Sequence, residues 1–158
     1  KCISYIIGKE SLAEEKIKNE LEPLLEKIAI KKNQKNIDDM KFMMILSMQG
    51  TSPIVAGSGT SGDYFIKMLG GKNIFGSVKG WKSVTAESIL IYNPDYIILP
   101  HKEMHKNSNV KAIMNNPIFK KTNAGKNDGY IIDDGMSMLG FGPRTIFSVL
   151  NSLNQILE

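Results

Sequence analysis

The feature that most constrains the fold is the run Phe42–Met48, which is apolar except for Ser47. A strand that is buried on both faces reads as continuous apolar residues, whereas a half-exposed strand alternates. Two further apolar stretches, Tyr96–Leu99 and Tyr130–Ile132, follow along the chain, and helical patterns separate the three. Strands that alternate with helices predict a three-layer α/β/α fold around a mainly parallel sheet.

Caps and glycines set the expected limits of the helices. A helix over 60–69 would begin with Thr60 or Ser61 as its N-cap and would end at Gly70-Gly71. Further helices are expected at 85–92 with Thr85 as cap, at 109–115 and at 143–157. In the last of these, Pro143 suits the first helical position and Gly142 the N-cap.

The longest helical pattern covers residues 10–32, where apolar residues recur at steps of three and four. Pro23 lies inside this pattern and is expected to kink the helix or divide it after Glu22. The polar stretch Lys32–Met40 is interpreted as a connector to the α/β part.

Composition excludes several classes of protein. A chain of 158 residues with 42% hydrophobic residues can form one domain with a substantial core. The net charge is only +4, and no aromatic residues interleave with clustered lysines, so a nucleic-acid surface is not predicted. A single cysteine, Cys2, excludes an internal disulfide. No run approaches the roughly 18–20 apolar residues of a membrane span.

Arg144 is the only arginine, since every other basic residue is a lysine. It lies at the expected start of the last helix, where free backbone N–H groups favour an anion. A planar guanidinium can hold a carboxylate through two hydrogen bonds, which lysine cannot do. The segment therefore predicts a site for an acidic ligand. The structural alternative is that Arg144 ties two loops together.

The segment Gly57–Gly62 matches the G-x-G-x-x-G pattern and precedes a helix. A nucleotide-binding loop also needs an acidic residue about 20 positions later for the ribose. The stretch Lys72–Gly80 offers none, and the short extended piece Ile54–Ala56 is a poor first strand for such a fold. A glycine-rich loop that lines a cleft is therefore favoured, with a nucleotide-binding enzyme as the alternative.

His101 and His105 are the only histidines and lie four residues apart, just after the second expected strand. Exposed loop histidines are the ordinary interpretation. Because α/β sheets bind ligands at the carboxyl ends of their strands, His101 is also a candidate metal ligand.

Methionine sulfur can ligate haem iron, so Met136 and Met138 have two interpretations, an iron ligand or a packing residue. Asp133-Asp134 point to opposite sides of a strand, which disfavours shared acid–base work. No hydroxyl or thiol lies in a recognisable nucleophile motif, so no enzyme activity is expected.

Several segments together resemble a known family. They are Ile54–Thr60, Gly70–Phe75, Ser83–Glu87, Asn93–Ile98 and Leu139–Thr145. In this order they are similar to the carboxyl-terminal part of periplasmic haem-binding proteins that serve ABC importers. The series Gly70–Phe75, Ser83–Glu87 and Asn93–Ile98 is shared with siderophore and cobalamin binders, and Leu-Gly-Phe-Gly-Pro-Arg-Thr points to the haem branch.

The resemblance implies a two-lobed architecture in which one long helix joins the lobes. Residues 1–9 would be the end of a missing first lobe, 10–36 the bridging helix and connector, and 37–158 the second lobe. In many members a tyrosine of the first lobe is the main iron ligand. Some members use a histidine of the second lobe, but Ser47–Thr60 contains none.

The resemblance also implies roles for particular residues. The expected ligand-binding residues are Arg144, Gly57, Ser58, Gly59, Thr60, Phe141 and Met138. Arg144 would face the cleft and either pair with a haem propionate or cover the ring. The loop at 57–60 would line the cleft with N–H groups and hydroxyls. Glu87 matches the glutamate that each lobe presents to the permease. His101 is kept as a candidate metal ligand.

The expected function is therefore capture of haem in the periplasm and delivery to an ABC permease, without bond chemistry. A ferric siderophore or a corrinoid is the alternative cargo, and an arginine would also suit an anionic siderophore. An isolated second lobe is further expected to be able to dimerise through the surface that a first lobe would cover.

Overall fold

A mixed sheet forms the centre of the molecule in a computed structural model that describes residues 2–101 and 108–157. Its strands lie in the order β4-β2-β1-β5-β6, and β3 pairs with β1. The strands are β1 (Lys41–Gln49), β2 (Ser52–Ala56), β3 (Lys72–Asn73), β4 (Trp81–Ser83), β5 (Tyr96–His101) and β6 (Tyr130–Asp134). The pairs β1·β3, β1·β5 and β5·β6 are parallel, while β1·β2 and β2·β4 are antiparallel. The predicted α/β fold with a mainly parallel sheet is confirmed.

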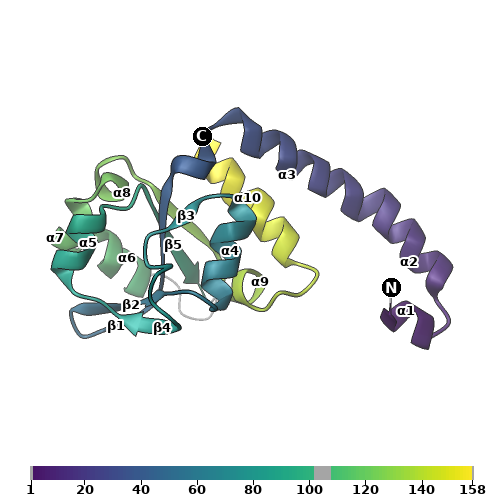
Figure 1. Cartoon of the computed structure of the whole chain (residues 1–158), viewed down its shortest axis with the longest axis horizontal. Coiled ribbons are helices and arrows are strands. Elements are labelled where there is room, and N and C mark those ends of the chain that lie inside the picture. Colours follow the sequence, from purple (N-terminus) through teal and green to yellow (C-terminus); the bar gives the residue numbers. More distant parts are fainter. Residues whose placement is uncertain (1, 102–107, 158) are drawn as a thin grey trace.

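Helices cover both faces of this sheet (Figure 1). One face carries α3 (Glu22–Gln34), α4 (Ser61–Leu69), α9 (Gly135–Leu139) and α10 (Thr145–Leu157). The other face carries α5 (Ala86–Tyr92), α6 (Ser108–Asn115), α7 (Pro117–Lys120) and α8 (Asn123–Lys126). The three layers of the prediction are therefore present. None of the described helices is both long enough and apolar enough to cross a lipid bilayer.

The two cores explain the apolar run that led to the fold prediction. Phe42 and Met44 pack into the core beneath α4 and α10, whereas Met43 and Ile45 pack into the core beneath α5. Burial on both faces ends there, because β5 pairs only with residues 42–44 of β1. The strand then continues as one arm of a hairpin with β2, and Leu46 is 42% exposed. The expectation of full burial up to Met48 was therefore wrong.

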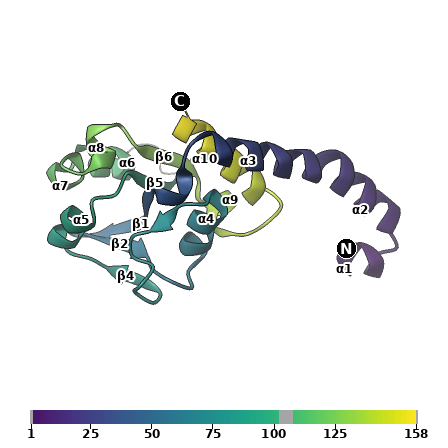
Figure 2. The same cartoon turned by 45° about the horizontal axis from the view of Figure 1, so that its top comes forward.

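The chain stays helical from Glu10 to Gln34 and projects from the sheet, with α1 (Cys2–Ile6) at its far end (Figures 1 and 2). It comprises α2 (Glu10–Lys16), a π-helical stretch at Ile17–Leu21, and α3. The expected division after Glu22 is absent. Proline removes one helical hydrogen bond and crowds the carbonyl four residues earlier, and the wider π turn directly before Pro23 accommodates both effects.

Most of the predicted helix limits are confirmed. Thr60 caps α4 by accepting a hydrogen bond from the Asp63 N–H at 3.1 Å, and Gly70 ends the helix with φ 98°. Thr85 caps α5 in the same way. A 3₁₀ turn at Ile37–Asp39 then links the long helix to the sheet within the expected connector.

The start of α10 differs from the prediction. The first helical residue is Thr145, and Pro143 lies in a turn closed by a hydrogen bond from Thr145 N to Gly142 O at 3.0 Å. The first helical bond runs from Ser148 N to Arg144 O at 3.2 Å. Arg144 therefore occupies the cap position, which places its side chain at the very end of the helix.

Candidate functional site

A pocket of about 450 Å³ lies where the parallel strands end. Its lining residues are Leu46, Pro100, His101, Gly135, Met136, Leu139 and Gly140. Leu46 comes from β1 and His101 from the last position of β5, while the rest of the opposite wall belongs to α9. Apart from His101, this lining consists of apolar side chains and glycines. The pocket thus lies at the carboxyl edge of the sheet, where α/β folds bind ligands.

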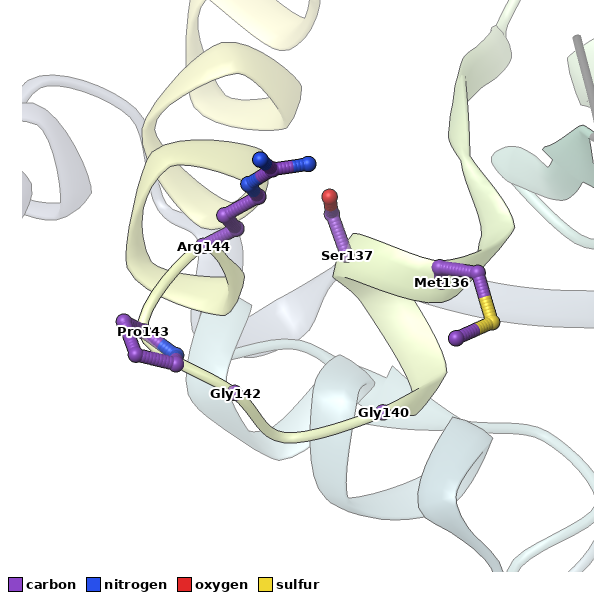
Figure 3. Close-up of a pocket in the computed structure, with 6 residues that line it drawn as sticks. All are labelled: Met136, Ser137, Gly140, Gly142, Pro143 and Arg144. Atoms are coloured by element: carbon purple, nitrogen blue, oxygen red, sulfur yellow. The ribbon is translucent and has the colours of Figure 1, made fainter.

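A second pocket, of about 340 Å³, adjoins the first and shares Met136 and Gly140 with it. Figure 3 shows its lining, which is Met136, Ser137, Gly140, Gly142, Pro143 and Arg144. The Met136 side chain is 74% exposed, whereas Met138 is fully buried in the core. Met138 therefore packs inside the lobe, and the methionine that a ligand can contact is Met136. Leu46, Pro100, Leu139, Met136, Gly140 and Pro143 together are called the apolar strip below.

Arg144 stands at one end of the apolar strip. Its guanidinium and the Ser137 hydroxyl point to the same side, between α10 and α9 (Figure 3). Within residues 2–101 and 108–157 the guanidinium makes neither a hydrogen bond nor an ion pair. The alternative that Arg144 ties two loops together is thus unsupported among the described contacts. The charge is available to an anionic ligand.

Asp134 positions Ser137 beside this guanidinium. Its Oδ2 accepts hydrogen bonds from the Ser137 hydroxyl at 2.7 Å and from the Ser137 N–H at 2.8 Å. These bonds, with a smaller contribution from the Met136 N–H and from the charge of Arg144, hold the pKa of Asp134 below its usual value. Asp134 is therefore an ionised N-cap of α9 at neutral pH, and the Ser137 hydrogen is already committed to it.

Phe141 follows the second pocket and has a strained backbone. Its φ of 48° is in the left-handed region that non-glycine residues rarely adopt. The ring is 46% exposed and meets Tyr64 of α4 edge-to-face, with centroids 6.3 Å apart. Tyr64 is itself 53% exposed. The two rings form an aromatic rim that the sequence suggested only through Phe141.

The backbone N–H groups of the Gly57–Thr60 loop all donate hydrogen bonds within the protein. Gly57 N donates to Gly80 O at 3.0 Å and Ser58 N to Val78 O at 2.6 Å. Gly59 N reaches Asp63 Oδ2 at 3.4 Å, and Thr60 N reaches Gly57 O at 3.4 Å. All four N–H groups that were expected to line the cleft are thus occupied. Their role toward a ligand stays a prediction.

The same loop lacks the geometry of a phosphate-binding loop. It follows β2, which runs antiparallel to both neighbouring strands. A dinucleotide fold instead needs a parallel first strand and free N–H donors at the helix start. This removes the structural basis for a nucleotide-binding enzyme at Gly57–Gly62.

The histidine prediction is met only in part by the described residues. His101 lines the first pocket, across from Met136. His105 lies outside the described residues. In residues 2–101 and 108–157, no three His, Cys, Asp or Glu side chains come together as a cluster for a metal ion. His101 as an iron ligand stays a prediction.

Glu87 is exposed in the first turn of α5. Helix α5 lies far from α9 in both views of the lobe (Figures 1 and 2). A hydrogen bond from its own backbone N–H, and then one from the Thr85 hydroxyl, hold the pKa of Glu87 below its usual value. It is therefore a fixed negative charge on a surface away from the pockets. Its docking role stays a prediction.

Three residues near Arg144 escaped the sequence analysis. Phe147, Ser148 and Asn151 lie three, four and seven positions after Arg144 and line one polar pocket with it. Residues at this spacing share one face of a helix. The helical spacing from Arg144 could therefore have identified these three residues in the sequence.

Comparison with known proteins decides the family. The sequence profile described as periplasmic binding protein matches residues 9–135. The chain belongs to the periplasmic binding protein family. Members of this family bind solutes. A comparison with curated proteins finds no match.

Solved structures support the family fold. The periplasmic haem-binding protein HutB of Vibrio cholerae has a TM-score of 0.79 at 24% identity, covering 99% of this chain and 60% of HutB. A possible iron-binding periplasmic solute-binding protein of Staphylococcus epidermidis has a TM-score of 0.74 at 26% identity, covering 99% and 59%. The periplasmic haem-binding protein RhuT of Roseiflexus has a TM-score of 0.67 at 19% identity, covering 97% and 58%. The chain thus spans about 60% of the length of these relatives.

Proposed function

We propose that this chain belongs to the substrate-binding component of an ABC importer, and that it captures haem in the periplasm and delivers it to the permease. The observation that carries the proposal is the apolar strip with the Arg144 guanidinium at its end, which pairs with no other residue among those that the structure describes. Haem has the matching chemistry, since it is a flat apolar ring with carboxylates along one edge. Similarity to proteins described as haem-binding supports the same cargo.

The roles of the residues follow from this match. Arg144 pairs with a propionate, while Met136 and the exposed ring of Phe141 lie against the macrocycle. His101, at the opposite end of the apolar strip, is the candidate iron ligand from this lobe. No bond is made or broken in the cargo, so capture and release are the whole function.

The alternative cargo is a ferric siderophore or a corrinoid, because such ligands could also pair with Arg144. Haem is favoured because ligands that are polar over their whole surface would leave the apolar strip uncovered. Docking to the permease is assigned to Glu87, whose charge is fixed at the surface.

The test is a titration of the 158-residue chain with haemin, cobalamin and ferrichrome, followed by absorbance and by intrinsic fluorescence. We expect saturable binding of haemin and a Soret shift, with Arg144→Ala weakening binding about tenfold, or ~1.4 kcal/mol. Lys126→Ala, which removes one positive charge from α8 on the other face of the sheet, is the matched control and should bind haemin like the wild type.

Two outcomes would reject the proposal: no saturable binding of haemin, or tighter binding of cobalamin or ferrichrome. Equal affinities for Arg144→Ala and Lys126→Ala would keep the cargo but remove Arg144 from the site. Glu87→Ala should bind haemin normally and lower haem uptake in cells that carry the permease; unchanged uptake would remove the docking role.

A further inference from the structure

The long helix is anchored to the α/β layers through its second part. Ile28 of α3 packs into the core beneath α4 and α10. Lys35, at the end of α3, donates hydrogen bonds to Ile156 O at 2.7 Å and to the Tyr96 hydroxyl at 3.2 Å. By contrast, none of the residues 10–21 is buried. This part, called the arm below, extends away from the sheet and has no buried side chain that would fix its direction (Figures 1 and 2).

The helical hydrogen-bond pattern changes where the arm meets the anchored part. The Ile17 N–H donates to Ala13 O, four residues earlier, as in an α-helix. The Glu22 N–H instead donates to Ile17 O, five residues earlier, which makes the π turn. Pro23 follows directly and has no N–H with which to restore the α pattern. Helices bend at prolines and at π turns, so the arm and α3 meet at the point where the long helix bends most easily.

The π turn faces the segment that carries Arg144. A groove of about 290 Å³ lies between the two, lined by Lys16, Ile17, Glu20, Leu21, Leu24, Pro143, Ile146 and Phe147. Pro143 also lines the pocket of Figure 3, and Phe147 N donates to Arg144 O at 3.0 Å. The Phe147 side chain is 55% exposed. The turn before α10 therefore has the candidate ligand pocket on one side and the arm on the other.

We propose that the π turn is a hinge, and that the arm bends there to close the groove against Pro143 and Phe147. The bent arm covers apolar side chains of both walls, so removal of apolar surface from water favours it. A ligand in the pocket on the other side of Pro143 holds this turn in place as the wall on which the arm closes. Ligand binding therefore shifts the arm towards its bent position. This coupling rests on the proposed function, whereas the hinge itself does not.

Distances between two spin labels, measured by pulsed electron paramagnetic resonance, test the hinge. One label is placed on the arm at Glu14→Cys or, as the internal reference, on the anchored part at Asn33→Cys. The second label is placed on α8 at Lys126→Cys, and every protein carries Cys2→Ser so that only the two labels react. The arm pair reports motion across the π turn, and the reference pair reports the lobe alone.

Pro23→Ala supplies the missing N–H and lets the α pattern continue through the π turn. Pro117→Ala makes the same change at the exposed start of α7, on the other face of the sheet, and is the matched control. Each protein is measured alone and with gallium protoporphyrin IX, which has the ring and the propionates of haem but a diamagnetic metal. Absorbance records whether this porphyrin binds saturably, and circular dichroism checks that the variants are folded.

We expect the distance distribution of the arm pair to be about twice as wide as that of the reference pair in the ligand-free wild type. Gallium protoporphyrin and Pro23→Ala should each narrow it to the width of the reference, and Pro117→Ala should leave it wide. Equal widths of the two pairs would overturn the hinge. A width that Pro23→Ala leaves unchanged would also overturn it, because fraying of an exposed helix gives that result.

The ligand arm of the experiment separates the coupling from the proposed function. Saturable porphyrin binding with no change in the arm distances would overturn the coupling and leave the proposed function standing. Absence of saturable porphyrin binding would overturn the proposed function and the coupling together, while the ligand-free distances still decide the hinge.

Discussion

Two glycine-rich turns lead into helices on the same face of the sheet, and both resemble ligand-binding segments in the sequence. The Gly57–Thr60 loop before α4 uses its four N–H groups within the fold. The Gly140–Arg144 turn before α10 instead exposes Phe141 and leaves the Arg144 guanidinium unpaired among the described residues. Hydrogen bonds within the fold thus hold the first turn rigid, whereas the side chains of Phe141 and Arg144 in the second turn are available to a ligand.

The comparison shows that glycine content alone does not identify a binding loop. At its left-handed position the first turn has Gly59, with φ 76°, whereas the second has Phe141, with φ 48°. A non-glycine residue in this region costs about 1 kcal/mol or more. The second turn therefore carries backbone strain that holds an exposed aromatic ring beside the pocket, while the first avoids that strain.

The largest effect that separates the two turns is expected from alanine at a glycine of each. A Cβ at Gly57 would lie 2.1 Å from Val78 O and 2.6 Å from Gly80 O, both backbone atoms. Gly57→Ala should therefore lower the free energy of unfolding by about 3 kcal/mol, or roughly 6–12 °C in Tm. Gly142→Ala has nothing within 4 Å of its Cβ and should change stability by less than about 0.5 kcal/mol.

Chemical denaturation of the two variants measures this difference. Equal stabilities would show that the Val78–Gly80 segment moves away at little cost, and the rigidity assigned to the first turn would then be wrong.

A second prediction concerns Asp63, whose carboxylate accepts a hydrogen bond from the Gly59 N–H of the first turn. Its side chain is almost fully buried and accepts hydrogen bonds from Lys67 at 2.7 Å, Asn73 at 3.0 Å and Gly59 at 3.4 Å. Burial alone would raise the pKa of Asp63, but these bonds outweigh it and hold the pKa below its usual value. Asp63→Asn should cost about 2 kcal/mol at pH 7, because the new amide faces donors.

The pH dependence follows from the sign of this shift. A lowered pKa in the folded state means that the ionised carboxylate contributes stability above about pH 4, and that this contribution is lost as the pH falls further. The gap between wild type and Asp63→Asn should therefore narrow below about pH 4. A gap that is constant from pH 7 to pH 3, measured by urea denaturation, would contradict the assignment; Asp39→Asn, at an exposed ion pair, is the control.

The sequence predicted the fold well where the signal was periodic and local. Phe42–Ile45 is apolar because two cores meet on that strand, and Thr60 and Thr85 are caps, so pattern and structure coincide. The exposed arm beyond Leu46 could not be recognised, because its exposure depends on where β5 stops pairing. Short elements such as α7, α8 and β3 contain too few residues to show a period.

The residues of the site were harder to predict from the sequence, because burial and hydrogen-bond partners determine which groups can contact a ligand. Met138 rather than Met136 was expected to contact a ligand, and only their opposite exposure in the structure corrects that choice. The N–H groups of the first turn look free until Val78 and Gly80 are seen to accept from them. These contacts join residues about 20 positions apart, which no local pattern reveals.

The smallest predicted effect tests the strain in the second turn. Phe141→Gly and Phe141→Ala both remove the ring and its contact with Tyr64, but only glycine adopts a φ of 48° without steric cost. The glycine variant should therefore be more stable than the alanine variant by about 1 kcal/mol, even though glycine is the more flexible residue in the unfolded chain. Thermal and urea denaturation of the pair measures the difference. Greater stability of the alanine variant would mean that the backbone relaxes once the ring is gone, so that the ring itself, rather than the fold around it, imposes the left-handed conformation.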